Sequence, residues 1–190
     1  MERTYTEDKL FEKTDFSESR LPKGDYENCT FANCHFSNAD LSDISFSDCE
    51  FRSCNLSLAK LKKTAFKNVR FKDCKLLGLH FEDCNEFLFT VDFDKCILNH
   101  SSFYRVKLKK MAFKHSSLRE VDFTEADLSS SSFDNCDLAG ATFEDTLLEK
   151  ADFRTAFHYS IDPEANRIKK ARFSMTGITG LLDKYDIEID

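Results

Sequence analysis

Residues 26–55 read YENCT FANCH FSNAD LSDIS FSDCE FRSCN, six units of five residues that each begin with a large apolar side chain. Two residues before a large side chain stands a small one, such as Cys29 before Phe31 or Ala39 before Leu41. Residues two apart on an extended chain point to the same side, so each unit sends a small and a large side chain inward and then turns a corner. A period of five fits neither a helix nor a plain strand, so the repeat itself is the structural unit.

The same periodicity extends in both directions from this stretch. It runs from Phe11 to Phe81, slips by two residues, and resumes from Leu88 to Phe153. Inward residues twenty apart tend to match, which favours four sides to a coil. A three-sided coil of fifteen residues would stack Phe on Leu throughout the second half. The sequence therefore predicts an all-β solenoid, a parallel β-helix whose successive coils pair strand on strand.

The periodicity also divides the chain into three parts. We predict an N-terminal cap at residues 1–10, a β-helix of repeats at 11–157 with a register slip at 82–88, and a C-terminal cap and dimerisation module at 158–190. Both ends need covers because the last coil of a solenoid exposes unpaired backbone. We expect the slip to be a local bulge through which the column continues, with at least one of its phenylalanine rings partly exposed.

Past the regular repeats the pattern changes. Ile168 and Phe173 still fit the periodicity and indicate one more partial coil. We predict a short helix over residues 175–184 with Ser174 as its N-cap, although each of its two glycines weakens it by ~1 kcal/mol relative to alanine. Residues 185–189 alternate apolar and polar side chains like a half-buried strand.

Composition and motifs limit the localisation and the kinds of chemical activity that we expect. The start of the chain has no apolar run for a signal peptide and no window is long enough to span a membrane, so we expect a cytoplasmic protein without membrane contact. All eight cysteines fall on the inward small position and no C-x-x-C pair occurs, which predicts reduced, buried thiols that fill space. No histidine has a nucleophile at a fixed relation, and no phosphate-binding glycine loop occurs. We therefore expect no enzyme activity, no catalytic residue, no metal and no cofactor.

Several units carry a family signature. ADLSS (126–130), CDLAG (136–140) and ADFRT (151–155) fit the pattern A-(D/N)-(L/F)-x-x, and over residues 9–155 the chain resembles pentapeptide repeat proteins. The resemblance implies a right-handed quadrilateral parallel β-helix.

The ending is similar to that of the Qnr-type quinolone-resistance proteins and the related gyrase-poison immunity proteins, through DPEANR (162–167) and GLLDKYDIEI (180–189). That group implies a rod-shaped homodimer, joined at its C-termini, that mimics DNA and binds a type II topoisomerase. The partner is then DNA gyrase or topoisomerase IV, which the protein modulates or protects from inhibitors, as in antibiotic resistance. Qnr-type proteins commonly carry sizeable loops associated with drug protection. This chain has only the two-residue slip, so the resemblance favours topoisomerase binding over direct quinolone protection.

Apolar residues near the end of the chain are the expected dimer contacts, because the last coil alone offers too little surface to cover them. These residues are Ile178, Leu181, Leu182, Tyr185, Ile187 and Ile189.

Charge forms bands along the sequence, and in a solenoid these become bands along the column. Residues 1–59 carry a net charge of −6, 60–75 of +6, 76–119 of +2, 120–164 of −10, and 165–190 of +1. The strongest acidic band adjoins the dimerisation module, which is where a DNA mimic would present charge to a basic groove.

Within that band, outward residues on the face that carries Phe123 and Phe143 are our candidates for partner binding. These residues are Asp122, Glu125, Glu144 and Asp145. A need for solubility also explains outward acidic residues, and this alternative stays open.

The basic residues form a waist that argues against a uniform DNA mimic. They are Lys60, Lys62, Lys63, Lys67, Arg70, Lys72 and Lys75, followed by Lys107, Lys109 and Lys110. No outward aromatic residues are interleaved with them and the sequence pI is about 5.3, so we expect no direct nucleic-acid binding. Two function classes remain: a topoisomerase-directed DNA mimic, and a generic interaction scaffold with an unrelated protein partner.

Overall fold

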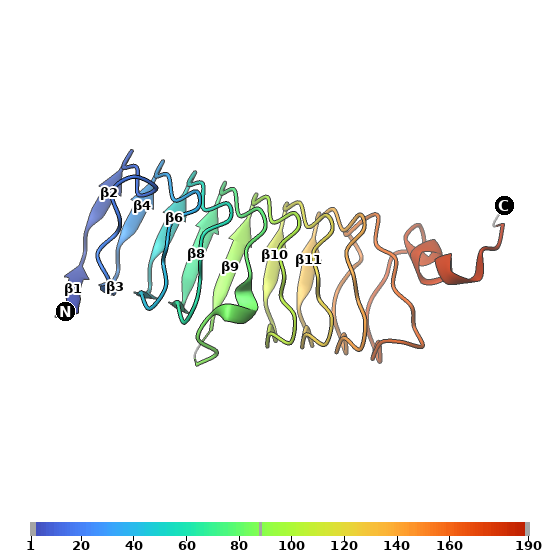
Figure 1. Cartoon of the computed structure of the whole chain (residues 1–190). Coiled ribbons are helices and arrows are strands. Elements are labelled where there is room, and N and C mark those ends of the chain that lie inside the picture. Colours follow the sequence, from blue (N-terminus) through green and yellow to red (C-terminus); the bar gives the residue numbers. More distant parts are fainter. Residues whose placement is uncertain (1–2, 88, 189–190) are drawn as a thin grey trace.

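Four short sides and four corners make one coil, and neighbouring coils pair through parallel β-bridges. A computed structural model describes residues 3–87 and 89–188. The chain winds into an elongated column with its N-terminal strands at one end and its C-terminal segment at the other (Figure 1). The predicted fold class, a parallel β-solenoid, is confirmed.

Eleven short strands and three 3-10 helices are assigned within the described residues. The strands are β1 (Thr4–Glu7), β2 (Leu10–Glu12), β3 (Gly24–Glu27), β4 (Thr30–Ala32), β5 (Ser45–Ser47), β6 (Glu50–Arg52), β7 (Ala65–Lys67), β8 (Val69–Lys72), β9 (Val91–Asp94), β10 (Ala112–Lys114) and β11 (Ser132–Asp134). The 3-10 helices are η1 (Phe81–Asp83), η2 (Ile178–Leu181) and η3 (Asp183–Tyr185).

We number the four faces by the inward side chains of one coil: face 1 by Phe31, face 2 by Phe36, face 3 by Leu41 and face 4 by Phe46. Face 1 holds a seven-stranded sheet of order β11-β10-β9-β8-β6-β4-β2, and face 4 holds a four-stranded sheet of order β1-β3-β5-β7. The other pairs are isolated parallel bridges, which lie on all four faces. Face 1 is therefore the one face on which strands pair into a single sheet across the bulge, among the described residues.

The register between coils is the predicted twenty residues, with one local exception. Phe31 pairs with Phe51, whereas Phe71 pairs with Phe93, which is twenty-two residues away. The register returns to twenty between Phe93 and Phe113. The slip is thus a two-residue bulge through which the column continues, as predicted, and Phe87 at this bulge is 78% exposed.

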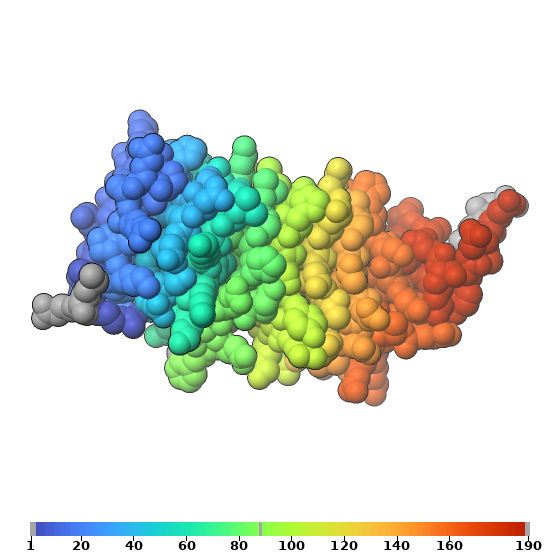
Figure 2. Space-filling view, viewed as in Figure 1, coloured from blue at the N-terminus to red at the C-terminus, as the bar shows by residue number. Residues whose placement is uncertain are grey.

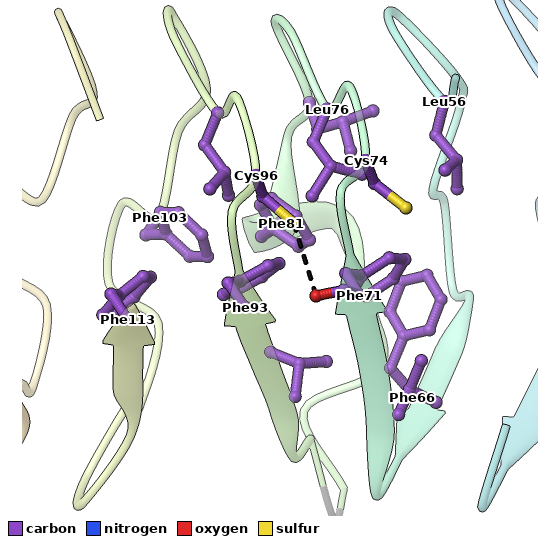
Figure 3. Packing of buried hydrophobic residues seen from close by; sticks show 14 of the residues in the cluster. Leu56, Phe66, Phe71, Cys74, Leu76, Phe81, Phe93, Cys96, Phe103 and Phe113 are labelled. Atoms are coloured by element: carbon purple, nitrogen blue, oxygen red, sulfur yellow. Dashed lines mark hydrogen bonds between the residues drawn. The ribbon is translucent and has the colours of Figure 1, made fainter. Parts of the chain in front are cut away.

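A ladder of phenylalanine rings fills the interior along face 1. Successive ring centroids are 4.7 to 5.5 Å apart and the ring planes lie within 19° of parallel. The rings are Phe11, Phe31, Phe51, Phe71, Phe93, Phe113, Phe133, Phe153 and Phe173. Part of the ladder is visible in Figure 3. Because it extends to Phe173, the extra partial coil predicted from Ile168 and Phe173 is confirmed. A fully buried ring contributes roughly 1.5–3 kcal/mol through burial.

Corners are built around a left-handed residue, which the periodicity alone did not reveal. The residue two positions after most large inward side chains has a φ between +49° and +63°, as Asn38 does at +57°. Asn and Asp tolerate this conformation better than most residues, and they occupy many of these corners. At Asn38 the Ala39 amide donates to the Phe36 carbonyl at 2.9 Å, which closes a type II turn.

Most cysteine corners are closed differently. Between Phe71 and Cys74 the described residues form no such turn bond. The Phe71 carbonyl instead accepts a hydrogen bond from Cys96 Sγ of the next coil at 3.3 Å (Figure 3). Cys54 and Cys74 bond the carbonyls of Phe31 and Phe51 in the same way. All eight cysteines are free and buried, as predicted. In addition, most of these thiols act as hydrogen-bond donors to carbonyls that the turn leaves open.

The N-terminal segment continues the column. Residues 4–7 form β1, which pairs with β3, so this part of the expected cap adds to the face 4 sheet. Below the first ring of the ladder, Lys9 Nζ lies 4.7 Å from the centroid of Phe11. The ammonium group over the ring face makes a cation–π contact at the open end of the aromatic ladder.

The C-terminal segment differs from our prediction. The expected α-helix over 175–184 is replaced by η2 and η3, and residues 186–188 form no strand; Ile189 lies outside the described residues. Ser174 Oγ does accept the Gly177 amide at 3.0 Å, as an N-cap would.

The reason lies in close packing against Tyr159. A Cβ on Gly180 would stand 2.1 Å from the Tyr159 carbonyl oxygen, and one on Gly177 would stand 2.2 Å from the Tyr159 hydroxyl. The Gly180 carbonyl accepts the Ile161 amide at 2.8 Å. These glycines are therefore needed for docking onto the last coil, whereas sequence reasoning treated them only as helix breakers.

Candidate functional site

The four predicted acidic residues lie together on face 3. Asp122 forms a parallel bridge with Thr142, and the Glu125 amide donates to the Glu144 carbonyl at 2.8 Å. The candidates thus occupy two adjacent coils, over the stacked rings of Phe123 and Phe143.

One of the four is already neutralised. Glu125 accepts two hydrogen bonds from Arg105, from Nε at 2.7 Å and from Nη2 at 3.0 Å, and a third from the Tyr104 hydroxyl at 3.1 Å. The hydrogen bonds from Arg105 hold the pKa of Glu125 below its usual range. The Arg105 guanidinium also lies 4.7 Å from the Tyr104 ring, which fixes its position. Glu125 therefore presents less free negative charge than its three neighbours.

Many other carboxylates of the acidic band are also ion-paired. The pairs are Glu120 with His100, Asp127 with Lys109, Asp137 with Arg119 and His158, Asp152 with Arg154 and Arg172, and Asp162 and Glu164 with Lys184. In the part of face 3 that the structure describes, Asp122, Glu144 and Asp145 form no ion pair. These three define the acidic patch. Glu144 and Asp145 are exposed, and Asp122 is half-buried with its Oδ1 accepting the Thr124 amide at 2.8 Å.

The end of the column, here called the apolar end, exposes several apolar side chains beside the acidic residues Asp183, Asp186 and Glu188. Met175 is 84% exposed, and Ile178, Tyr185 and Ile187 are also exposed, whereas Leu181 and Leu182 are half-buried. Lys184 joins this end to face 3, because its Nζ lies 2.7 Å from Asp162 and 2.6 Å from Glu164. The acidic patch and the apolar end are therefore neighbours.

The basic waist contrasts with the acidic band. Within the described residues, none of the seven cations between Lys60 and Lys75 forms an ion pair, and all of them are exposed. They follow one coil around all four faces, from Lys60 on face 3 through Lys67 and Lys72 to Lys75 on face 2. These seven cations therefore form a belt of free positive charge around one coil, the basic belt.

Sequence reasoning missed Arg105 and Met175. Arg105 stands twenty residues before Glu125, which is the coil register, so a search for opposite charges at that spacing would have found the pair. Met175 stands directly after the Ser174 cap, where the sequence offers no signal of exposure.

No group of three or more His, Cys, Asp or Glu side chains in the described part of the chain is arranged to hold a metal ion. No helix among the described residues is long and apolar enough to cross a membrane.

A four-sided parallel β-solenoid with left-handed corners and a five-residue repeat defines a class of repeat protein. A protein-family model described as "Pentapeptide repeat region" matches this chain at residues 24–87 and 80–153. Since these matches span well over half of the sequence, the chain belongs to the pentapeptide repeat family. No curated protein matches it.

Solved structures share the fold at low sequence identity. HetL, a pentapeptide repeat protein involved in heterocyst differentiation regulation from the cyanobacterium Nostoc sp. strain PCC 7120, is 14% identical with a TM-score of 0.60, over 91% of this chain and 87% of its own. A trypsin-treated variant of QnrB1, a plasmid-mediated fluoroquinolone resistance protein, is 20% identical with a TM-score of 0.49, over 97% of this chain and 99% of its own. At these identities the likeness concerns the fold alone.

Proposed function

We propose that this protein is a non-enzymatic DNA mimic that binds a type II topoisomerase, DNA gyrase or topoisomerase IV. The observation that carries the proposal is the acidic patch of Asp122, Glu144 and Asp145, which is free of ion pairs and lies near the end of a rod. A rigid row of carboxylates can occupy a basic groove that otherwise holds a phosphate backbone.

The rod doubles its length by dimerising through the apolar end. Exposed Met175, Ile178, Tyr185 and Ile187 gain cover when two columns meet there, and each copy then presents its acidic patch beside the junction. The proposal includes modulation of the enzyme or protection from its inhibitors. It also places the protein in the cytoplasm, since eight free thiols suit a reducing compartment.

A titration of the protein into a gyrase supercoiling assay, together with direct binding at increasing salt, tests the proposal. Reversing the charge of Asp122, Glu125, Glu144 and Asp145 together is expected to abolish binding. Among single reversals, Glu144 and Asp145 should weaken binding more than Glu125, which Arg105 already neutralises. Binding should also weaken as salt screens the patch, since the Debye length is ~8 Å at physiological ionic strength.

The matched control neutralises Lys62, Lys63 and Lys67, which are exposed, and it should leave binding unchanged or slightly tighter. Equal binding by the acidic-patch variant and the parent protein would contradict DNA mimicry.

Light scattering tests the dimer separately. The parent protein is expected to be a dimer at micromolar concentration. Removal of residues 174–190 should give a monomer. Gly180→Ala, which sets a methyl group against the Tyr159 carbonyl, should weaken the dimer by displacing the segment. A monomeric parent would exclude the rod-shaped dimer.

A scaffold for an unrelated protein partner is the second candidate, and the basic belt favours it. Free cations in one complete coil are of no use to a DNA mimic, but they suit a partner with an acidic surface. Loss of binding to an isolated partner on neutralising the belt, without loss on reversing the acidic patch, would support the scaffold.

A further inference from the structure

Face 4 carries an excess of positive charge in the second half of the column. Coils follow one another along the rod in sequence order (Figure 2), so residues twenty apart on one face form a row along its long axis. Three such rows run along face 4 and its corner with face 1. Their residues are Lys107, Asp127, Leu147 and Arg167 in the first row, Lys109, Ser129, Glu149 and Lys169 in the second, and Lys110, Ser130, Lys150 and Lys170 at the corner. We call this surface, with its seven cations and two carboxylates, the face 4 strip.

The charge bands of the sequence do not reveal this strip. Residues 120–164 carry a net charge of −10, but Asp127 and Glu149 are the only carboxylates of that band that lie on the strip. The others lie on the remaining faces and corners, as Asp122 does on face 3 and Asp152 on face 1. Our expectation of no direct nucleic-acid binding used the pI of the whole chain, which does not describe a single face.

Most cations of the strip have no acidic partner. Lys109 Nζ lies 3.1 Å from Asp127 Oδ2, and within the described residues the other six cations form no ion pair. All seven are exposed. Glu149 is half-buried, and its Oε2 accepts a hydrogen bond from Ser129 Oγ at 3.5 Å. The carboxylates of the strip therefore leave most of its positive charge available to a partner.

The corner row places lysines at left-handed positions. Lys110, Lys150 and Lys170 each have a φ of +61°. Gly, Asn and Asp adopt this conformation more readily than lysine does. The backbone therefore does not explain why lysine occupies three of the four corners in this row, whereas a role for the ammonium groups does.

The side chains of the strip favour a phosphate backbone over a protein partner. The core of a protein interface is rich in apolar and aromatic side chains, whereas surfaces that bind nucleic acid are polar and strongly positive. Among residues 107–170, face 4 exposes no large apolar side chain, and Leu147 is half-buried. The strip also has no aromatic ring on which an unpaired base could stack, as single-strand binding requires. A duplex, whose phosphates face outward, fits this surface better.

The length of the strip suits several successive phosphates. Four coils stacked at ~4.8 Å place the first and last residues of a row ~14 Å apart. Over that length one strand of B-form DNA presents about four phosphates, at ~3.4 Å of helix axis for each. Between Lys110 and Lys150 the exposed Ser130 offers a hydroxyl donor to the same backbone.

We propose that the face 4 strip binds the phosphate backbone of a double-stranded nucleic acid, independently of base sequence. The strip adjoins the acidic patch on face 3 but shares no residue with it. Duplex binding is therefore separate from topoisomerase binding, and the protein alone is sufficient to test it.

The test measures fluorescence anisotropy of short labelled duplexes with the full-length protein over a range of salt concentrations. DNA and RNA duplexes form separate arms, and the tighter one identifies the source of the phosphates. We expect binding at low salt that weakens linearly in log K against log salt concentration. The triple variant Lys110→Gln, Lys150→Gln and Lys170→Gln should bind more weakly, with a slope shallower by about 2.7, at ~0.9 for each lost phosphate contact.

The matched control is the triple variant Lys13→Gln, Lys63→Gln and Lys95→Gln. These lysines are also exposed and left-handed, with φ of +50°, +58° and +55°, but they lie at other corners of the column. The control removes the same net charge and should keep the slope of the parent protein. Circular dichroism and thermal unfolding confirm that both variants are folded. Equal loss of binding by the two variants would overturn the proposal, as would a parent protein that binds neither duplex at low salt.

Two other polyanions complete the test. Poly-glutamate and vesicles that contain phosphatidylserine should both bind more weakly than the duplexes. Tighter binding of either one, lost in the strip variant, would overturn the proposal in favour of an acidic protein segment or an anionic membrane. Duplex binding by a protein that fails to bind gyrase would remove the proposed function and support this inference.

Discussion

Two coils, one from each half of the column, contain the same inward residues in different arrangements. The coil of Phe51, Leu56, Leu61 and Phe66 places its two rings on adjacent faces 1 and 4. The coil of residues 93–108 has Phe93 and Phe103 on opposite faces 1 and 3, with leucine on the other two. Two phenylalanines and two leucines fill either coil, so interior volume is conserved while the packing pattern changes.

The bulge is the place where one arrangement gives way to the other. Phe66 is the last ring of the face 4 column and Phe81 is the first ring of the face 3 column. Phe89 contacts both edge-on, with centroids 6.4 Å from Phe66 and 6.2 Å from Phe81. The two extra residues therefore accommodate a transfer of the second aromatic column from face 4 to face 3.

The face 1 ladder, which both halves share, should be the most sensitive element. Phe113→Ala removes a fully buried ring from between two stacked neighbours and is expected to destabilise the fold by about 3–5 kcal/mol. Phe11→Ala, at the half-buried end of the same ladder, should have a smaller effect. Denaturant unfolding measures both, and equal losses would show that the ladder is not the common core.

Moving one phenylalanine from face 3 to face 4 tests whether each arrangement of rings is specific to its half of the column. The double variant Phe103→Leu with Leu108→Phe keeps composition but moves a ring to face 4, as in the first half. We expect a loss of about 1–3 kcal/mol because the ring no longer stacks between Phe81 and Phe123. A neutral result would mean that inward volume alone decides packing.

The buried thiols make the stability of the column depend on pH. Burial raises the pKa of Cys49 to about 12, and it raises the pKa of Cys136 to about 12 as well. An unfolded thiol ionises near pH 8.5, so the unfolded state loses protons first. Stability should be full below pH 8.5 and should fall as pH rises towards 12, by at most about 1.4 kcal/mol per pH unit for each such thiol.

Unfolding measured between pH 7 and 11 checks this expectation, with Cys49→Ser as the control that removes one contribution. A thiol titration should find few reactive groups in the native protein and eight after denaturation. Rapid reaction of most thiols in the native protein would contradict their burial.

Most of the fold could be predicted from the sequence because every five-residue unit repeats the same pattern of inward and outward side chains. The alternation of Cys29 with Phe31, and its equivalents, determines which side chains face inward and gives the twenty-residue register. The conformation of the C-terminal segment after Ser174 could not be predicted in this way. Its conformation depends on a contact between Gly180 and Tyr159 that has no counterpart elsewhere in the chain.

The candidate site was predictable only in part, for a related reason. Periodicity placed Glu125 and Glu144 on one face, but free charge depends on side-chain partners such as Arg105 in the coil below. The bulge was visible in the sequence only as an irregular spacing, and nothing in the sequence indicated that Phe89 and Val106 line one cavity there.

The bulge also marks a corner at which the chain can accept inserted residues. On face 1 the strands pair across it, from Val69 with Val91 to Lys72 with Asp94, so residues inserted at this corner should leave the face 1 register intact. The entropy of closing a longer loop rises by only ~0.6 kcal/mol for each doubling of its length. A foreign epitope or a binding loop could therefore be grafted at this corner, on a rod whose other corners set its orientation.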